Sequence, residues 1–180
     1  MRKIPSDFSY SKYGLTARLV REEDAAFIVK LRTNKRLSKY IHETDENIEK
    51  QKDWIREYKE REREGKEYYF IYFSGERPVG VNRVYNITEE SSTGGSWICS
   101  EDSSIEESLA TNFMSFEIRE LFDIPIGPYT VSKGNNQVLK FHLRMGAEIV
   151  SENDEEYTLI RNAKKYNVMK DKYIKMLFNN

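Results

Sequence analysis

The pattern of hydrophobic and polar positions predicts a chain in which strands and helices are interspersed. Short apolar or alternating runs are typical of strands, and apolar residues three or four positions apart are typical of helices. Strands are expected at residues 15–20, 67–74, 77–87, 96–100, 129–131, 148–151 and 156–161. Helices are expected at residues 21–32, 44–63, 105–122 and 162–180, and a further short helix is expected to end at Gly146.

Several of the expected helices carry an apolar face, and the second carries clear signals at both ends. Gly65 is expected to end the second helix, because glycine adopts the left-handed conformation that often follows a helix. Thr44 or Asp45 is expected to cap its start, since short polar side chains accept hydrogen bonds from the free N–H groups there. The positions predicted to face inward are Ile48, Ile55 and Tyr58 in the second helix and Leu109, Phe113, Phe116 and Leu121 in the third.

Composition narrows the class of protein. The 180 residues are expected to form one domain, 1–180, with a core at about 15–161 and a C-terminal helix at 162–180. Hydrophobic residues make up 38% and the net charge is −1, so neither a disordered chain nor a nucleic-acid partner is expected. No apolar run approaches the roughly 20 residues of a membrane span, and the single cysteine, Cys99, excludes an internal disulfide. A cytoplasmic protein with no membrane contact and no metal site is expected.

The stretch from Val131 to Ala147 is the most informative part of the sequence. It predicts a strand, a polar turn with adjacent asparagines, an amphipathic helix and a glycine stop. The residues that share one face of this helix are Val138, Phe141, His142 and Met145. The stretch resembles the last strand–helix unit of the GCN5-related N-acetyltransferases, the GNAT family. Asn135 and Gly146 have the spacing of that family, and His142 stands where the family often has a tyrosine.

The order of the expected elements is also similar to that of the GNAT family. The segments A-R-L-V-R-E-E-D-A-A and Q-K-D-W-I resemble segments of its ribosomal-protein and amino-sugar branches. The resemblance implies an α/β (α+β) fold, with a central mixed, mostly antiparallel sheet flanked by helices and, here, an extra C-terminal helix. It also implies acetyl-CoA as co-substrate and a small-molecule primary amine as acceptor.

The sequence leaves the acceptor open. The segment from Arg32 to Tyr58 and the segment N-I-T-E-E-S-S look most similar to enzymes that acetylate the amino group of nucleotide-linked amino sugars. Ribosomal proteins, peptide N-termini and small amines are alternative acceptors. A non-catalytic or weakly CoA-binding interaction module with the same fold is a further alternative. The oligomeric state also stays open, with a homodimer among the options.

The segment expected to bind the pyrophosphate departs from the family pattern. In the family, glycines at the start of the third helix let backbone N–H groups approach the phosphates. The matching segment here is Ile105 to Asn112, where Glu106 and Ser108 stand in the glycine positions. Two overlapping capping-box patterns, S-x-x-E, begin at Ser103 and Ser104 and would occupy those N–H groups. The cofactor-binding candidates in this segment are Ser108, Leu109 and Ala110.

The resemblance also assigns roles near the reacting atoms. Backbone N–H groups of Ile98, Cys99 and Ser100 are expected to polarise the thioester carbonyl and hold the pantetheine arm. His142, as an imidazolium, is expected to protonate the departing thiolate, or else to be a core residue. Asn135 is expected to bind the cofactor amide or to orient the end of the strand, or else to be a turn residue. Phe141 completes the cofactor-binding candidates.

A base is also needed to take the proton of the amine. His42 lies in the linker between the first two helices, which lines the acceptor side in the GNAT family. His42, or the adjacent Glu43, is therefore the candidate base. The alternative is an exposed histidine with no role. For Cys99 a buried structural thiol is the favoured interpretation, because no neighbouring histidine or aspartate marks it as a nucleophile.

Overall fold

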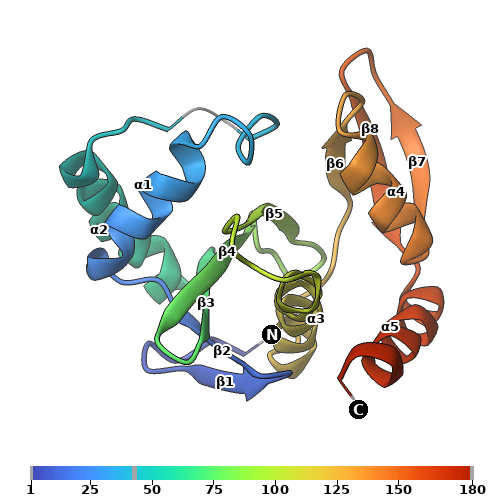
Figure 1. Cartoon of the computed structure of the whole chain (residues 1–180), viewed down its shortest axis with the longest axis horizontal. Coiled ribbons are helices and arrows are strands. Elements are labelled where there is room, and N and C mark those ends of the chain that lie inside the picture. The colour runs from blue at the N-terminus through green and yellow to red at the C-terminus, as the bar shows by residue number, and fades with distance from the viewer. Residues whose placement is uncertain (1, 42–43, 179–180) are drawn as a thin grey trace. The chain divides into compact units, whose positions relative to one another are not determined.

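The computed structural model describes residues 2–41 and 44–178 and has the α+β fold that the sequence predicts (Figure 1). Contacts between Cα atoms divide the chain into two compact units, Met1–Pro125 and Ile126–Asn180. Each unit has its own antiparallel sheet. That the two units form one domain stays a prediction.

The first unit is built on a five-stranded antiparallel sheet in the order β1-β2-β3-β4-β5. Its strands are β1 (Ser9–Lys12), β2 (Leu15–Leu19), β3 (Tyr68–Ser74), β4 (Arg77–Tyr85) and β5 (Thr93–Cys99). Its helices are α1 (Ala25–Thr33), which follows a 3-10 turn at Glu22–Asp24, α2 (Ile48–Glu64) and α3 (Ile105–Leu121). Because β5 lies at one edge, its outer side has no strand neighbour in this sheet.

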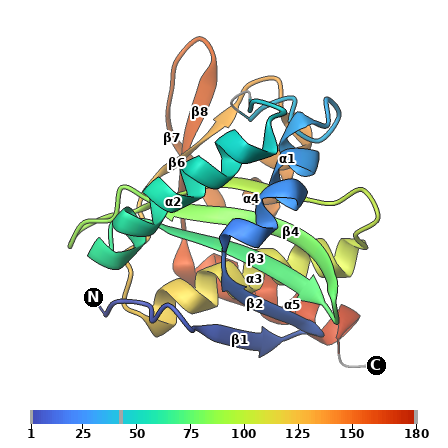
Figure 2. The same ribbon diagram turned by 90° about the vertical axis from the view of Figure 1, so that its left-hand side faces the viewer.

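Helices cover both faces of this sheet: α1 and α2 lie on one face and α3 lies on the other (Figure 2). The continuous apolar run of β3 follows from this arrangement, since a strand buried on both faces needs no polar side. Tyr69 and Ile71 face α1 and α2 and belong to the core cluster there. On the opposite face, the Tyr72 hydroxyl donates to Asn82 over 2.6 Å, and the Asn82 amide donates to Ser115 of α3 over 2.8 Å.

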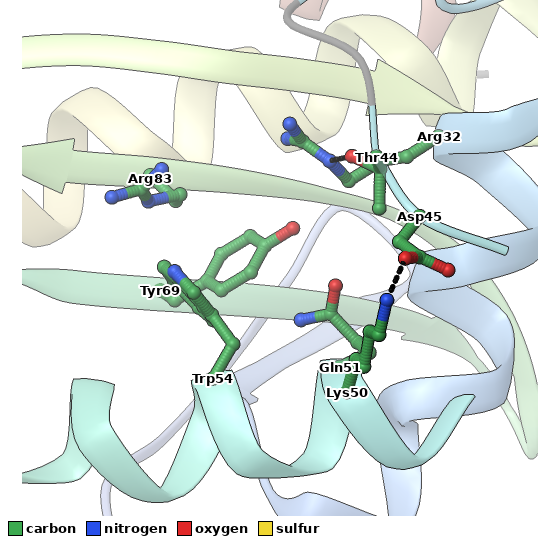
Figure 3. Close-up of a pocket in the computed structure, with 8 residues that line it drawn as sticks. All are labelled: Arg32, Thr44, Asp45, Lys50, Gln51, Trp54, Tyr69 and Arg83. Carbon is green, nitrogen blue, oxygen red and sulfur yellow. Dashed lines mark hydrogen bonds and ion pairs between the residues drawn. The ribbon is translucent and has the colours of Figure 1, made fainter. Parts of the chain in front are cut away.

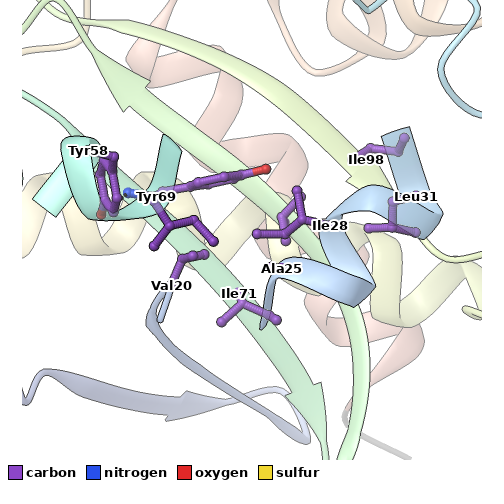
Figure 4. Close-up of a cluster of buried hydrophobic side chains, with 10 residues drawn as sticks. Val20, Ala25, Ile28, Leu31, Tyr58, Tyr69, Ile71 and Ile98 are labelled. Atoms are coloured by element: carbon purple, nitrogen blue, oxygen red, sulfur yellow. Dashed lines mark hydrogen bonds between the residues drawn. The ribbon is translucent and has the colours of Figure 1, made fainter. Parts of the chain in front are cut away.

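The core beneath α1 and α2 joins segments that are distant in the sequence (Figure 4). Its buried members are Val20, Ala25, Ile28, Leu31, Ile55, Tyr58, Tyr69, Ile71, Val81 and Ile98. The Tyr58 hydroxyl also accepts a hydrogen bond from the backbone N–H of Tyr69 over 2.8 Å, which ties α2 to β3. The cluster fixes the surface on which the residues of α1, α2, β3 and β4 meet.

Several details of the helices differ from the sequence prediction. The N-cap of α2 is Asn47, whose side chain accepts from Glu49 and Lys50, so the expected cap at Thr44 or Asp45 is wrong. Because the helix therefore begins at Ile48, that side chain lies in the first turn and is 41% exposed instead of buried. Leu121 is also exposed, because α3 ends there. Gly65 ends α2 in the left-handed conformation, as predicted.

The second unit is a three-stranded antiparallel sheet with two helices. The strands are β6 (Tyr129–Ser132), β7 (Ala147–Glu152) and β8 (Glu156–Arg161), in the order β6-β8-β7. The helices are α4 (Asn136–Arg144) and the predicted C-terminal helix α5 (Ala163–Leu177). Val138 and Leu139 of α4 pack against the small core of this sheet. Gly146 has φ +88°, as expected after a helix, and a Cβ there would lie 2.5 Å from the side chain of Lys165.

The strands of the two units lie in two sheets, and every strand pair described is antiparallel, which agrees with the expected mostly antiparallel arrangement. The exposed and largely polar strand β1 was not predicted. Within residues 2–41 and 44–178, no helix is long and apolar enough to cross a membrane.

Candidate functional site

The edge strand β5 carries an irregularity in the middle of its pairing with β4. Arg83 pairs with Gly95 and Val81 pairs with Ile98, so Asn82 faces two residues, Ser96 and Trp97. This is a β-bulge, and Ser96 has φ +50°, a left-handed conformation that non-glycine residues rarely adopt. Such a bulge redirects backbone groups at an edge, which is where an extended ligand can bind a strand.

The pairing beyond the bulge determines which N–H groups face outward. The N–H of Ser100 donates to the carbonyl of Val79 over 2.7 Å and is therefore occupied. Since bonding residues alternate along an antiparallel strand, Ile98 also bonds to β4, and the N–H of Cys99 points to the open edge. Of the three backbone groups expected to bind the cofactor, Cys99 is thus the one directed outward.

The side chain of Cys99 has a structural role. Its Sγ lies 3.6 Å from the hydroxyl of Thr111 on α3, and Trp97 donates to the same hydroxyl over 2.9 Å. Burial raises the pKa of the Cys99 thiol, so the protonated form is favoured at neutral pH. These contacts fix β5 against α3 and agree with the structural interpretation of the thiol.

Side chains at the start of α3 form hydrogen bonds with the backbone N–H groups there. The Ser104 hydroxyl accepts from the N–H of Glu107 over 3.1 Å, and the Glu107 carboxylate accepts from the N–H of Ser104 over 3.0 Å. Arg77 holds the same carboxylate at 2.5 Å. A hydrogen bond from its own backbone lowers the pKa of Glu106, so a second anion lies at this helix end. Leu109 and Ala110 are buried core residues, and Ser108 is half-buried.

The open edge of β5 therefore fits the amide-bearing arm of an acyl-CoA, whereas the first turn of α3 does not fit its diphosphate in the present arrangement. An anion would compete with two carboxylates and a closed capping box there. The sequence prediction of a capped helix at this point is confirmed for Ser104 and Glu107.

Replacing Glu106 and Ser108 together by glycine is expected to tighten the binding of acetyl-CoA. The double change removes one negative charge from the helix start and lets the backbone approach a phosphate. It is also expected to lower stability by about 1 to 2 kcal/mol, because glycine is a poor helix former. Calorimetry with acetyl-CoA and urea unfolding on the same samples measure both effects. Unchanged affinity, or nanomolar binding by the wild type, would contradict this argument.

A pocket of about 250 Å³ lies on the α1 and α2 side of the first unit (Figure 3). It is lined by Arg32 of α1, Thr44 and Asp45 of the following segment, Lys50, Gln51 and Trp54 of α2, Tyr69 of β3 and Arg83 of β4. Arg32 donates from Nε to the Thr44 hydroxyl over 2.6 Å and from Nη1 to Ser96 Oγ over 3.3 Å. The second bond connects the pocket directly to the β5 bulge.

The charges of the pocket lining are predominantly positive. Of the lining residues that the structure describes, three are cationic and one, Asp45, is a carboxylate that pairs with Lys50 at 2.5 Å. Arg83 is held by Glu67, which is buried and also pairs with Arg61 at 2.7 Å. The guanidinium of Arg83 lies over the Trp54 ring, 4.9 Å from its centroid. The pocket therefore presents an oriented cation to a bound molecule.

One buried polar side chain of the pocket has no hydrogen-bond partner within the described part of the chain. The Tyr69 hydroxyl has none although the residue is only 1% exposed. Burial raises the pKa of Tyr69, and the positive charges of Arg32 and Arg83 oppose that rise. The side chain of Gln51, a residue 8% exposed, lines the same pocket. A buried polar group without a partner costs about 1 to 3 kcal/mol, so such groups point to a ligand.

Comparison with solved structures identifies the family. The chain matches apo FdhC, described as a nucleotide-linked sugar GNAT, with a TM-score of 0.82 and 37% sequence identity. The match covers 94% of this chain and 98% of that chain. This chain belongs to the GNAT family. It therefore transfers an acyl group to an amine, as the family does.

Other GNAT structures share the fold at lower identity. The ribosomal-protein-S5-alanine acetyltransferase from Vibrio fischeri has a TM-score of 0.68 at 18% identity, with 87% of this chain and 98% of that chain covered. The spermidine N-acetyltransferase from Vibrio cholerae, in complex with CoA and spermine, has a TM-score of 0.70 at 15% identity, with coverage of 87% and 99%. No family model matches the chain, and no curated protein sequence matches it.

The second unit of this GNAT holds the other predicted site residues. Asn135 is the N-cap of α4, and its side chain accepts from the N–H of Val138 over 3.4 Å; its expected role in binding the cofactor stays a prediction. His142 is half-buried between the rings of Tyr129 and Phe141, with centroids 4.8 and 5.2 Å away. Burial lowers the pKa of His142 to about 4. The expected imidazolium is therefore wrong at neutral pH, where the ring is neutral.

The low pKa of His142 predicts a pH dependence of stability. The pKa is about 4 in the folded chain and 6.5 ordinarily, so the unfolded chain binds more protons between these values. The stabilising contribution is fully present above pH 6.5 and is lost as the pH falls toward 4. We expect the wild type to lose about 2 kcal/mol more than His142→Phe between pH 7 and pH 4.5. Urea unfolding at the two pH values tests this; equal losses would contradict the lowered pKa.

The sequence did not predict the residues of the pocket as a group. Gln51, Tyr69 and Arg83 lie on three different elements, and each alone looks like part of an ordinary helix or strand. The one available signal was the resemblance of the segment from Arg32 to Tyr58 to amino-sugar enzymes. His42, the candidate base, lies outside the described residues, and its role stays a prediction.

Proposed function

We propose that this GNAT is an acetyl-CoA-dependent N-acetyltransferase whose acceptor is the amino group of a nucleotide-linked amino sugar. The observation that carries the proposal is the positive lining of the pocket between α1, α2, β3 and β4. Arg32 and Arg83 both act on the hydroxyl of Tyr69, since their positive charges oppose the rise in its pKa. An acceptor with negatively charged phosphates would be attracted to this lining.

The same charges disfavour the other acceptors of the family. A polyamine carries several ammonium groups, and each would be repelled by two guanidinium groups at close range. A peptide N-terminus carries one positive charge, and among the described lining residues only Asp45, which pairs with Lys50, complements it. The similarity to FdhC, a nucleotide-linked sugar GNAT with 37% sequence identity, supports the same acceptor class.

The chemistry needs three groups from the chain. Acetyl-CoA supplies an acetyl group activated as a thioester. We assign the outward N–H of Cys99 on β5 to the thioester carbonyl, where a backbone donor stabilises developing negative charge. We assign His42 as the base that takes the amine proton, directly or through water. We assign His142 as a neutral N–H that hydrogen-bonds to the leaving thiolate, which then takes its proton from water.

The capped start of α3 supports weak binding of the co-substrate. Ser104 and Glu107 occupy each other's backbone groups, and Arg77 neutralises part of the carboxylate charge. The diphosphate of acetyl-CoA would then be held less firmly than in relatives with a glycine-rich turn. A high apparent KM for acetyl-CoA is the expected consequence.

The proposal is tested by assaying release of free thiol with a panel of acceptors. The panel contains a nucleotide-linked amino sugar, the free amino sugar, spermidine and a peptide with N-terminal alanine. Mass spectrometry of the products shows which amine carries the acetyl group. Acetylation of the nucleotide-linked sugar is expected, and acetylation of spermidine or the peptide alone would overturn the acceptor assignment.

A further inference from the structure

We propose that the pocket of the first unit is a diphosphate subsite, in which Arg83, Tyr69 and Gln51 bind the phosphate oxygens of the acceptor. The inference rests on the proposed function, because it names the part of a nucleotide-linked sugar that this pocket takes. The pocket residues belong to α1, α2, β3, β4 and the segment after α1, and all lie in the first unit.

The hydrogen-bonding groups left open in the pocket are those that a phosphate needs. Arg83 uses Nε and Nη2 for Glu67, at 2.8 and 2.5 Å, and no described residue accepts from its Nη1. The Tyr69 hydroxyl is also without a partner, and the Gln51 amide, which can donate, lines the same pocket. A phosphate oxygen accepts several hydrogen bonds at once, so one phosphate satisfies donors that the chain itself leaves unpaired.

Burial and orientation distinguish these donors from ordinary surface cations. In Figure 3 the Tyr69 hydroxyl points to the side of the pocket where Thr44 and Arg32 lie, and the Gln51 amide extends from α2 toward the same space. Glu67 forms an ion pair with Arg83, and the Arg83 guanidinium stacks over the ring of Trp54. The guanidinium is thus fixed before a ligand arrives, which lowers the entropic cost of binding.

Size and charge decide which part of the acceptor the pocket takes. At about 250 Å³ the pocket is smaller than the roughly 300–1,000 Å³ typical of a site for a whole drug-sized ligand, so it holds one part of a nucleotide-linked sugar. An amino group beside Arg32 and Arg83 would be repelled. The diphosphate is therefore the part placed here, and the amino-bearing ring lies outside this pocket.

The experiment titrates the full chain with inorganic pyrophosphate, uridine diphosphate and uridine by calorimetry at low salt. Pyrophosphate and uridine diphosphate are expected to bind, and uridine is expected to bind at least about tenfold more weakly. Tyr69→Phe is expected to weaken pyrophosphate binding about tenfold, because a hydrogen bond to a charged group is lost. Arg83→Lys keeps the charge beside Glu67 but loses the planar fork, and an equal or larger loss is expected.

Tyr72→Phe is the matched control. Tyr72 lies on the same strand as Tyr69 and is also fully buried, but its hydroxyl donates to Asn82 on the other face of the sheet. This control is expected to lower the melting temperature and leave pyrophosphate affinity unchanged within about twofold. Tyr69→Phe is expected to keep or raise the melting temperature, since an unpaired hydroxyl is removed.

The outcomes separate this inference from the proposed function. If neither Tyr69→Phe nor Arg83→Lys changes the affinity for pyrophosphate, or if the wild type does not bind pyrophosphate at low salt, the subsite assignment is wrong. This holds even if a nucleotide-linked amino sugar is acetylated. Binding that both variants weaken supports the subsite even if the acceptor panel shows no acetylation of such a sugar. Equal weakening by Tyr72→Phe would show a general loss of structure and would also overturn the assignment.

Discussion

Replacing His142 with phenylalanine is expected to lower kcat about a hundredfold while the affinity for acetyl-CoA stays nearly unchanged. The imidazole is neutral at neutral pH, because burial lowers its pKa to about 4. A neutral N–H can still donate to the leaving sulfur, and phenylalanine cannot. Steady-state rates with the acceptor that the panel identifies, together with calorimetry for acetyl-CoA, measure the two quantities separately.

His142→Tyr provides the control for packing. Tyrosine and phenylalanine fill similar space beside Tyr129 and Phe141, but only the phenol donates a hydrogen bond. We expect the tyrosine variant to retain at least about ten times the rate of the phenylalanine variant. Equal rates for the wild type and His142→Phe would remove His142 from the mechanism. Equal losses in both variants, with equal losses of melting temperature, would indicate a packing role.

Replacing Gly80 with alanine is expected to destabilise the first unit by about 3 kcal/mol. A Cβ at Gly80 would lie 2.7 Å from the carbonyl oxygen of Ile98 and 2.9 Å from Cys99 Sγ. Because one of these atoms belongs to the backbone, β5 has to move away from β4. We also expect the rate of acetyl transfer by the folded protein to fall, since β5 carries the outward N–H of Cys99. Urea unfolding and initial rates measure the two effects.

Gly14→Ala separates packing from backbone strain. Gly14 has φ +75°, but a Cβ there has nothing within 4 Å. Its replacement is expected to cost about 1 kcal/mol, from the left-handed conformation alone, and to leave the rate of acetyl transfer unchanged. If Gly80→Ala lowers the free energy of unfolding no more than Gly14→Ala does, β5 can shift to accommodate the added Cβ. The close pairing of β4 and β5 would then not be essential to the site.

Much of the fold was predictable because it depends on local sequence signals. Gly65 and Gly146 end helices where glycine is strongly favoured, and the apolar run of β3 marks a strand that is covered on both faces. Errors arose where two local signals competed. Asn47 caps α2 in place of Thr44 or Asp45, because those residues bond instead to Arg32 and Lys50.

The site was less predictable, because it depends on contacts between distant segments. Nothing near Tyr69 in the sequence shows that its hydroxyl is unpaired, since that depends on α1 and α2. The β5 bulge likewise depends on the register with β4, which hydrophobic alternation does not specify there. By contrast, the capping box of Ser104 and Glu107 is local, and the sequence predicted it correctly.

The central claim is that the positive pocket selects an anionic acceptor for acetyl transfer. A competition assay tests it most directly: equal concentrations of a nucleotide-linked amino sugar and spermidine are offered to the enzyme with acetyl-CoA, and both products are quantified. The account predicts at least about a hundredfold preference for the nucleotide-linked sugar, which corresponds to about 3 kcal/mol, and a decrease in this preference at high salt. Equal use of both acceptors, or a preference for spermidine, would contradict it.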